Sequence, residues 1–258
     1  MQPDLGDIPA PPAARRAIGL GSLVRALRGR RPDQGCFVVG VTGAVASGKS
    51  TLSSALRSRL RAWPGRPSVE RVSTDGFLHP NPVLDARGLT ARKGFPESYD
   101  TAALRQALTQ VRQGPADFPG YSHVTYDVDP ALLRRIDRPD VLIIEGLSLD
   151  LDRGSTEAGP RLVDCLIYLE ADEADIEHWF VARFLGLWAA AEHDPTSFYA
   201  RFRGLDCDQT AALARTVWNQ INLPNLREHI AKAADVADII VRKRRDHSIE
   251  AVELRTPA

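Results

Sequence analysis

The stretch Gly43-Ala-Val-Ala-Ser-Gly48-Lys49-Ser50 matches the phosphate-binding pattern GxxxxGK[ST] at every fixed position. It follows residues 36–41, a short apolar and β-branched segment that predicts a buried parallel strand. Leucines at four-residue spacing predict an amphipathic helix over residues 50–63, directly after it. A strand, a glycine-rich loop and a helix in this order form a cradle for a chain of phosphates.

The residue types of this loop suit a nucleotide bound with magnesium. Glycines let the backbone curl so that its N–H groups point at phosphate oxygens, and the dipole of the following helix adds to the attraction. We expect Lys49 to reach the β- and γ-phosphates of ATP and the Ser50 hydroxyl to bind Mg²⁺. The motif alone does not separate kinases from GTPases or ATP-driven motors. The expected nucleotide-binding residues of the loop are Gly43, Ala44, Val45, Ala46, Ser47, Gly48, Lys49, Ser50 and Thr51.

Strand and helix patterns alternate along the rest of the chain, which predicts a parallel sheet with helices on its faces. The expected strands are 69–73, 140–145, 164–169, 239–241 and 249–254, and the expected helices are 15–29, 101–114, 173–191 and 208–219. Asp100 is the expected N-cap of the helix that begins at residue 101. The predicted fold is therefore a P-loop NTPase-type α/β fold of three layers, with a mostly parallel central sheet.

The chain is expected to consist of a short tail and one domain. Residues 1–14 are rich in Pro and Ala and predict a disordered N-terminal tail. Residues 15–258 predict a single P-loop kinase domain, whose apolar content is sufficient for a sizeable core. Within it, residues 77–99 are rich in Pro and Gly and predict an ordered, lid-like loop.

Composition argues against several classes of protein. Lys plus Arg and Asp plus Glu both number 33, so a formal net charge of zero gives no reason to expect a nucleic-acid partner. No apolar stretch approaches the length that spans a bilayer, so we expect no membrane partner. The three cysteines form no CxxC pair, which disfavours a disulfide framework or a zinc site and indicates a reducing, cytoplasmic location.

Two carboxylates follow expected strands and are candidates for the chemistry. Asp75 comes after the strand at 69–73, and Glu145 ends the strand at 140–145. Strand ends in an open α/β sheet face one ligand crevice, so both acids would lie beside ATP. One would hold the magnesium, and the other would take a proton from an acceptor hydroxyl. In isolation, an Asp before a Gly is more simply a turn-forming residue.

Seven blocks in order, covering most of the chain, resemble the bacterial type I pantothenate kinases, which are related to uridine kinase and phosphoribulokinase. They include Ser73-Thr-Asp-Gly-Phe-Leu-His-Pro-Asn81, Arg92-Lys-Gly-Phe-Pro-Glu-Ser-Tyr-Asp100 and Tyr121-Ser-His-Val-Thr-Tyr-Asp-Val128. The other blocks lie at residues 41–51, 139–147, 183–185 and 218–226. The resemblance implies an ATP- and Mg²⁺-dependent kinase that phosphorylates the terminal hydroxyl of pantothenate, the first step towards coenzyme A. It also implies a homodimer.

The resemblance assigns roles to individual residues. It implies Asp75 as the catalytic base, Lys49 at the phosphates and Arg183 near the transferred phosphate, where a guanidinium offsets developing charge. Ser50 and Glu145 are the expected metal ligands. The remaining implied contacts are Tyr121, His123, Tyr126 and Asn225 with the acceptor, together with Asp75 and Arg183, and His247 with the adenine.

The acceptor side departs from the pattern of this family. Phe180, Phe198 and Phe202 stand where the family carries tyrosines that line the pocket. A site discriminates through the groups that hydrogen-bond its substrate, so the loss of three phenols can change the preferred acceptor. Pantothenate is the leading prediction, and a sugar acid, polyol or nucleoside is the alternative. A non-catalytic nucleotide-binding regulator is a further alternative, which the intact set of Lys49, Asp75 and Arg183 argues against.

Overall fold

The computed structural model describes residues 19–147, 149 and 161–255, and the predicted tail lies outside these residues. Strand β1 (Phe37–Gly43), which leads into the phosphate-binding loop, is buried along its whole length. It pairs in parallel with β5 (Val141–Gly146) on one side and with β6 (Cys165–Glu170) on the other. The apolar, β-branched sequence of β1 therefore corresponds to a central strand that is covered on both faces.

Three further strands complete a six-stranded sheet with the order β2-β5-β1-β6-β7-β8. Strand β2 (Val69–Ser73) pairs in parallel with β5, and β7 (Ile239–Lys243) pairs in parallel with β6. Only the edge strand β8 (Ile249–Leu254) runs antiparallel to its neighbour within the described sheet. The predicted fold class, an α/β fold with a mostly parallel central sheet, is confirmed.

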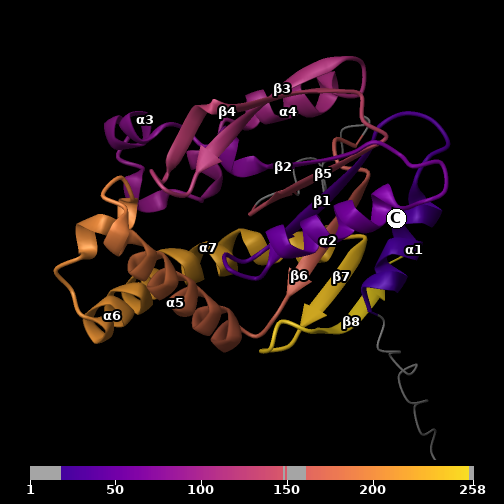
Figure 1. Ribbon diagram of the computed structural model, residues 1–258. Coiled ribbons are helices and arrows are strands. Elements are labelled where there is room, and N and C mark those ends of the chain that lie inside the picture. Colours follow the sequence, from indigo (N-terminus) through magenta and orange to yellow (C-terminus); the bar gives the residue numbers. More distant parts are fainter. Residues whose placement is uncertain (1–18, 148, 150–160, 256–258) are drawn as a thin grey trace, which may run out of the picture.

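Helices cover both faces of the sheet and produce three layers (Figure 1). On one face, α1 (Leu20–Arg30) and α2 (Lys49–Arg61) pack leucines against the side chains of Phe37, Val39 and Val41. On the other face, Val38 of the same strand joins the core formed with α4 (Thr101–Gln110) and α5 (Glu173–Ala190). The alternation of strand side chains between the two faces thus builds two separate cores.

The helices that the sequence predicted are present close to their predicted ranges. Asp100 accepts a hydrogen bond from the backbone N–H of Ala103 at 2.9 Å, which confirms it as the N-cap of α4. The remaining helices are α3 (Asn81–Ala86), α6 (Cys207–Val217), α7 (Leu223–Glu228) and α8 (Ala233–Val236). A π-helical turn, Trp218–Asn222, joins α6 to α7. No helix among the described residues is both long and apolar enough to cross a lipid bilayer.

Besides the short helices α7 and α8, two features differ from the sequence expectation. Helix α3 lies inside the segment that was expected to be a loop throughout, and an antiparallel hairpin of β3 (Pro115–Ser122) and β4 (Asp127–Asp137) was not predicted at all. Strand β4 is exposed over most of its length, so its sequence lacks the apolar pattern by which a strand is recognised. The hairpin packs against the turn that carries Asp75, and a Cβ added to Gly76 would lie 1.8 Å from the Pro119 carbonyl oxygen.

Candidate active site

The phosphate-binding loop connects β1 to α2 and depends on two glycines. Gly43 has a φ of +144°, and a Cβ there would lie 2.7 Å from the carbonyl oxygen of Leu169. Gly48 has a φ of +92° and immediately precedes α2, so the first N–H groups of this helix are directed at the loop. The backbone forms the expected anion-binding concavity at the start of a long helix.

Lys49 lies across this loop. Its Nζ donates hydrogen bonds to the carbonyl oxygens of Gly43 at 3.1 Å and Ala44 at 2.8 Å. Burial lowers the pKa of Lys49 to about 8, and the carboxylates of Glu145 and Asp75 partly oppose this decrease. An ammonium group forms a stronger hydrogen bond with a charged phosphate oxygen than with a neutral carbonyl oxygen. The Lys49 ammonium group can therefore leave the two carbonyl oxygens and bind the phosphates of a nucleotide.

Ser50 and Glu145 meet at the other side of the loop. The Ser50 hydroxyl donates a hydrogen bond of 2.7 Å to Glu145 Oε1, and Glu145 is 7% exposed near the carboxyl end of β5. No group of three or more His, Cys, Asp or Glu side chains that could hold a metal occurs among the described residues. Mg²⁺ typically takes one or two protein oxygens and completes its shell with phosphates and water, and this pair fits that requirement.

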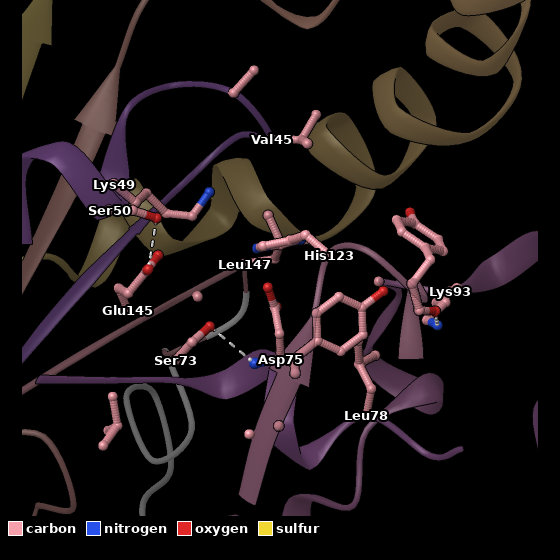
Figure 2. Close-up of a pocket in the computed structure, with 18 of the residues that line it drawn as sticks. Val45, Lys49, Ser50, Ser73, Asp75, Leu78, Lys93, His123, Glu145 and Leu147 are labelled. Carbon is pink, nitrogen blue, oxygen red and sulfur yellow. Dashed lines mark hydrogen bonds between the residues drawn. The ribbon is translucent and has the colours of Figure 1, made fainter. Parts of the chain in front are cut away.

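Asp75 stands in the 3-10 turn Thr74–Phe77 that follows β2. Its backbone N–H donates to the Ser73 hydroxyl at 3.2 Å, which fixes the start of the turn. Figure 2 shows Asp75 at the same pocket as Lys49, Glu145 and His123. The turn therefore presents a carboxylate to the space in front of the phosphate-binding loop, as expected from strand ends that share one edge of a sheet.

These groups line a cavity of about 510 Å³. Arg183 reaches it from α5, and Tyr121 and Tyr126 reach it from the β3–β4 hairpin, so parts of the chain far apart in sequence enclose it together with the phosphate-binding loop. The predicted site residues that line it are Val45, Ala46, Lys49, Ser50, Asp75, Tyr121, His123, Tyr126, Glu145, Phe180 and Arg183. The nucleotide side and the acceptor side of the prediction thus meet in one cavity.

Aromatic side chains form the acceptor side of the cavity. The ring of Tyr121 lies edge-on to His123 and to Tyr126, with centroid separations of 5.2 Å and 6.0 Å. Burial raises the pKa of Tyr126 to about 12 and raises that of Tyr121 further. Burial also lowers the pKa of His123. The two phenols therefore stay protonated at neutral pH and can donate hydrogen bonds to an acceptor molecule.

Phe198 and Phe202 do not line the cavity, although both were predicted to contact the acceptor. Phe198 packs on Tyr126 with ring centroids 4.6 Å apart, and Phe202 packs against Phe184 at 6.0 Å. Tyr199, between them, is the residue of this 3-10 segment that lines the cavity. Of the three phenylalanines, Phe180 alone is placed to touch an acceptor directly, and a phenol that the sequence analysis missed is present at Tyr199.

Asn225 is buried rather than presented to the cavity. Its Nδ2 donates to the carbonyl oxygen of Gly94 at 2.8 Å, and its Oδ1 has no hydrogen-bond partner within the described part of the chain. Asn222, one turn earlier, is the asparagine that lines the cavity. The acceptor role predicted for Asn225 stays a prediction, and the structure adds Asn222 as a candidate for it.

His247 lies beside the phosphate-binding loop but outside the cavity lining. Its ring stacks on Trp179 at 4.2 Å, and its Nδ1 is 3.3 Å from Nζ of Lys243, which donates to the carbonyl oxygen of Ser47 at 2.8 Å. Burial and the charge of Lys243 lower the pKa of His247. A neutral, stacked imidazole next to the loop is compatible with the predicted adenine contact.

Three cationic residues of the cavity were not singled out by the sequence analysis. Lys93 donates to Asn81 Oδ1 and to the Tyr126 carbonyl oxygen, both at 2.6 Å, and its Nζ lies over the rings of Tyr121 and Tyr126. Lys93 stands within one of the resembling sequence blocks, which was the signal available for it. The others are Arg71 in β2 and Arg134 in β4, for which no motif gave a signal.

Comparison with known proteins gives consistent results. Residues 38–179 match the model of the phosphoribulokinase/uridine kinase family. A pantothenate kinase of Rhizobium rhizogenes is 44% identical over 228 residues, 85% of this chain and 69% of that protein. A pantothenate kinase of Sorangium cellulosum is 44% identical over 88% of this chain and 74% of its own length. Among solved structures, a putative fructose transport system kinase from Silicibacter sp. TM1040 aligns with a TM-score of 0.64 at 29% identity, over 81% of this chain and 93% of that one.

Proposed function

The chain belongs to the phosphoribulokinase/uridine kinase family and to the pantothenate kinases, and from this premise we propose that it phosphorylates the primary hydroxyl of pantothenate. The protein is an ATP-dependent kinase that acts on a small molecule. The main support for the proposal is that Lys49, Asp75 and Arg183 line the same cavity as several tyrosines. A cavity of about 510 Å³ suits an acceptor of metabolite size beside the phosphates.

Each residue of the cavity has a separate role in phosphoryl transfer. Lys49 holds the phosphates of ATP, and Asp75 accepts the proton of the attacking hydroxyl. Arg183 offsets the negative charge that develops on the transferred group. The phenols of Tyr121 and Tyr126 and the ring of His123 orient the acceptor, which converts encounter in solution into attack from a fixed position.

Magnesium is proposed as the cofactor, with Ser50 and Glu145 as its protein partners. The fit rests on their direct contact of 2.7 Å beside the loop and on the oxygen chemistry of both groups. Bound magnesium would neutralise part of the negative charge of the phosphates. Ser50 and Glu145 would orient it, since each is held by a regular element, α2 and β5 respectively.

The position of Phe180 in the cavity lining favours a different acceptor. Phe180 lines the cavity with an apolar ring where the family carries a phenol, so a hydrogen bond to pantothenate would be missing there. A sugar acid, polyol or nucleoside that places carbon against this ring is the second candidate. The four phenols that line the cavity, at Tyr99, Tyr121, Tyr126 and Tyr199, favour a polar acceptor in either case.

A screen of ADP release decides between these acceptors. The purified enzyme is given ATP and Mg²⁺ with pantothenate, its analogues, nucleosides and sugar acids in turn, and ADP is measured by a coupled assay. We expect the highest kcat/KM for pantothenate, and no acceptor-dependent ADP release from Asp75→Asn. A higher kcat/KM for another class would replace pantothenate as the substrate, and the absence of turnover with every acceptor would favour a regulator.

Two further proposals concern the protein in the cell. An enzyme that consumes ATP and carries three free cysteines is suited to the reducing cytoplasm. The family resemblance also supports a homodimer, and the mass in solution, measured by light scattering after size-exclusion chromatography, tests this directly. One chain has a mass of 28.3 kDa and a dimer has twice this mass, so a measured mass near that of one chain would exclude the dimer.

A further inference from the structure

Arg71 places an additional cation next to the proposed metal-binding pair. It lies in the middle of β2, at the level of Ile143 in the neighbouring strand β5. Its side chain lines the cavity and is 32% exposed, so it belongs neither to the core nor to the open surface. None of the roles assigned above uses this charge.

The guanidinium lies at the metal-binding end of the cavity. Its Nη1 is 3.6 Å from Glu145 Oε1 and 3.5 Å from the carbonyl oxygen of Ser50. The same Oε1 accepts the hydrogen bond of the Ser50 hydroxyl. Glu145 Oε1 therefore contacts both the Ser50 hydroxyl and the Arg71 guanidinium. We expect the same oxygen to bind the divalent cation.

The neighbouring acid on β2 does not compete for Arg71. Glu70 is engaged by Arg61 and Arg134, and Arg134 also donates to the backbone carbonyl oxygen of Arg71. These contacts hold the backbone of Arg71 to the β3–β4 hairpin while its guanidinium faces Glu145. Because Glu145 is buried, its carboxylate gains more from a nearby positive charge than an exposed one would.

We propose that Arg71 competes with the divalent cation for Glu145. In the nucleotide-free enzyme the guanidinium neutralises the Glu145 carboxylate, and it moves away from this carboxylate when the metal binds together with ATP. The inference rests on the metal assignment made under the proposed function. A divalent cation that enters alone has to displace the guanidinium and meets a like charge, which weakens its binding. A cation that enters with ATP brings phosphates, whose negative charge offsets this repulsion. The enzyme therefore takes its metal together with the nucleotide rather than before it.

Binding of Mn²⁺ to the nucleotide-free enzyme tests this without any turnover, because free Mn²⁺ is measured by its electron paramagnetic resonance signal. Arg71→Leu removes the charge, and we expect it to bind Mn²⁺ about tenfold more tightly than the wild type. Arg71→Lys keeps the charge and should stay within about threefold. Arg135→Leu is the matched control, because it removes one charge from an exposed pair with Asp117 outside the cavity lining, and it should leave Mn²⁺ binding unchanged.

Glu145→Gln, alone and combined with Arg71→Leu, separates this inference from the metal assignment. We expect Glu145→Gln to weaken Mn²⁺ binding strongly in both backgrounds. If it changes nothing, the metal assignment is wrong. If it weakens Mn²⁺ binding but Arg71→Leu binds Mn²⁺ no more tightly than the wild type, Arg71 is a structural ion-pair partner and the inference is overturned. Circular dichroism establishes that each variant is folded, and Arg71→Gln replaces Arg71→Leu if the latter is not.

Discussion

Lys49 is the residue whose loss should affect catalysis most simply. It contacts two loop carbonyl groups rather than the apolar core, so Lys49→Ala should leave the fold intact while the phosphates lose their main cation. We expect kcat to fall by at least about a hundredfold in the ADP-release assay. Lys232→Ala, which changes an exposed lysine far along the chain, is the control and should retain activity. Turnover of Lys49→Ala within tenfold of the wild type would contradict the assignment of this loop.

The acidity of the same ammonium group predicts a pH dependence. Burial lowers the pKa of Lys49 to about 8, so the free enzyme carries the charge below this pH and loses it as the pH rises through this value. Because kcat/KM for ATP reports the free enzyme, it should fall about tenfold per pH unit above about pH 8. The profile is measured from about pH 6 to pH 10 at saturating acceptor. A plateau that extends to pH 10 would show that Lys49 stays charged.

At the scale of elements, α5 and the 3-10 segment after it determine which aromatic residues reach the acceptor. Phe180 on α5 lines the cavity, whereas Phe198 and Phe202 pack beside it. We expect Phe180→Tyr to raise kcat/KM for pantothenate about two- to tenfold, the worth of one neutral hydrogen bond. Phe198→Tyr and Phe202→Tyr are the matched controls and should change it less than about twofold. Equal effects of all three would mean that the phenols act through packing instead of contact.

The contact between the Asp75 turn and the β3–β4 hairpin predicts a steric effect. A Cβ at position 76 would overlap the backbone of Pro119, which cannot rotate away as a side chain can. Gly76→Ala should therefore lower the free energy of unfolding by about 1–3 kcal/mol, measured by urea denaturation, and reduce kcat by displacing Asp75. At Gly114 an added Cβ meets nothing within 4 Å, so Gly114→Ala is the control for the substitution itself. Equal unfolding free energies for the two variants would refute the predicted overlap.

The elements also explain which site residues could be predicted from the sequence. Lys49 and Ser50 could be predicted from a local motif, because the loop and the start of α2 determine where these two side chains lie. Asn222 and Tyr199 were missed in favour of sequence neighbours because they lie in a π-helical turn and a 3-10 segment. In such turns the rotation per residue differs from that of an α-helix, so a position in the sequence no longer specifies a direction in space.

For the molecule as a whole, the central sheet was predictable and the wall of the cavity was not. Strands buried on both faces have continuous apolar sequences, and β1, β5 and β6 were identified on that basis. The hairpin that carries Tyr121 and Tyr126 is formed by two strands that follow each other in the sequence, but its exposed strand has no such pattern. Arg71 shows a different limit, because its partner Glu145 is more than seventy positions away and becomes a neighbour only through the pairing of β2 with β5.

The pairing of β1 has a consequence for the order of events during synthesis. Both hydrogen-bonding neighbours of this strand lie far downstream, with Phe37 aligned to Val141 and Val39 aligned to Cys165. At about 5–20 residues per second, a ribosome needs on the order of 5–20 s to make the intervening chain. During that interval neither of the two strands that flank β1 in the sheet has been made. The strand that later presents the phosphate-binding loop therefore keeps its backbone hydrogen-bonding groups unpaired in the sheet until these downstream segments emerge.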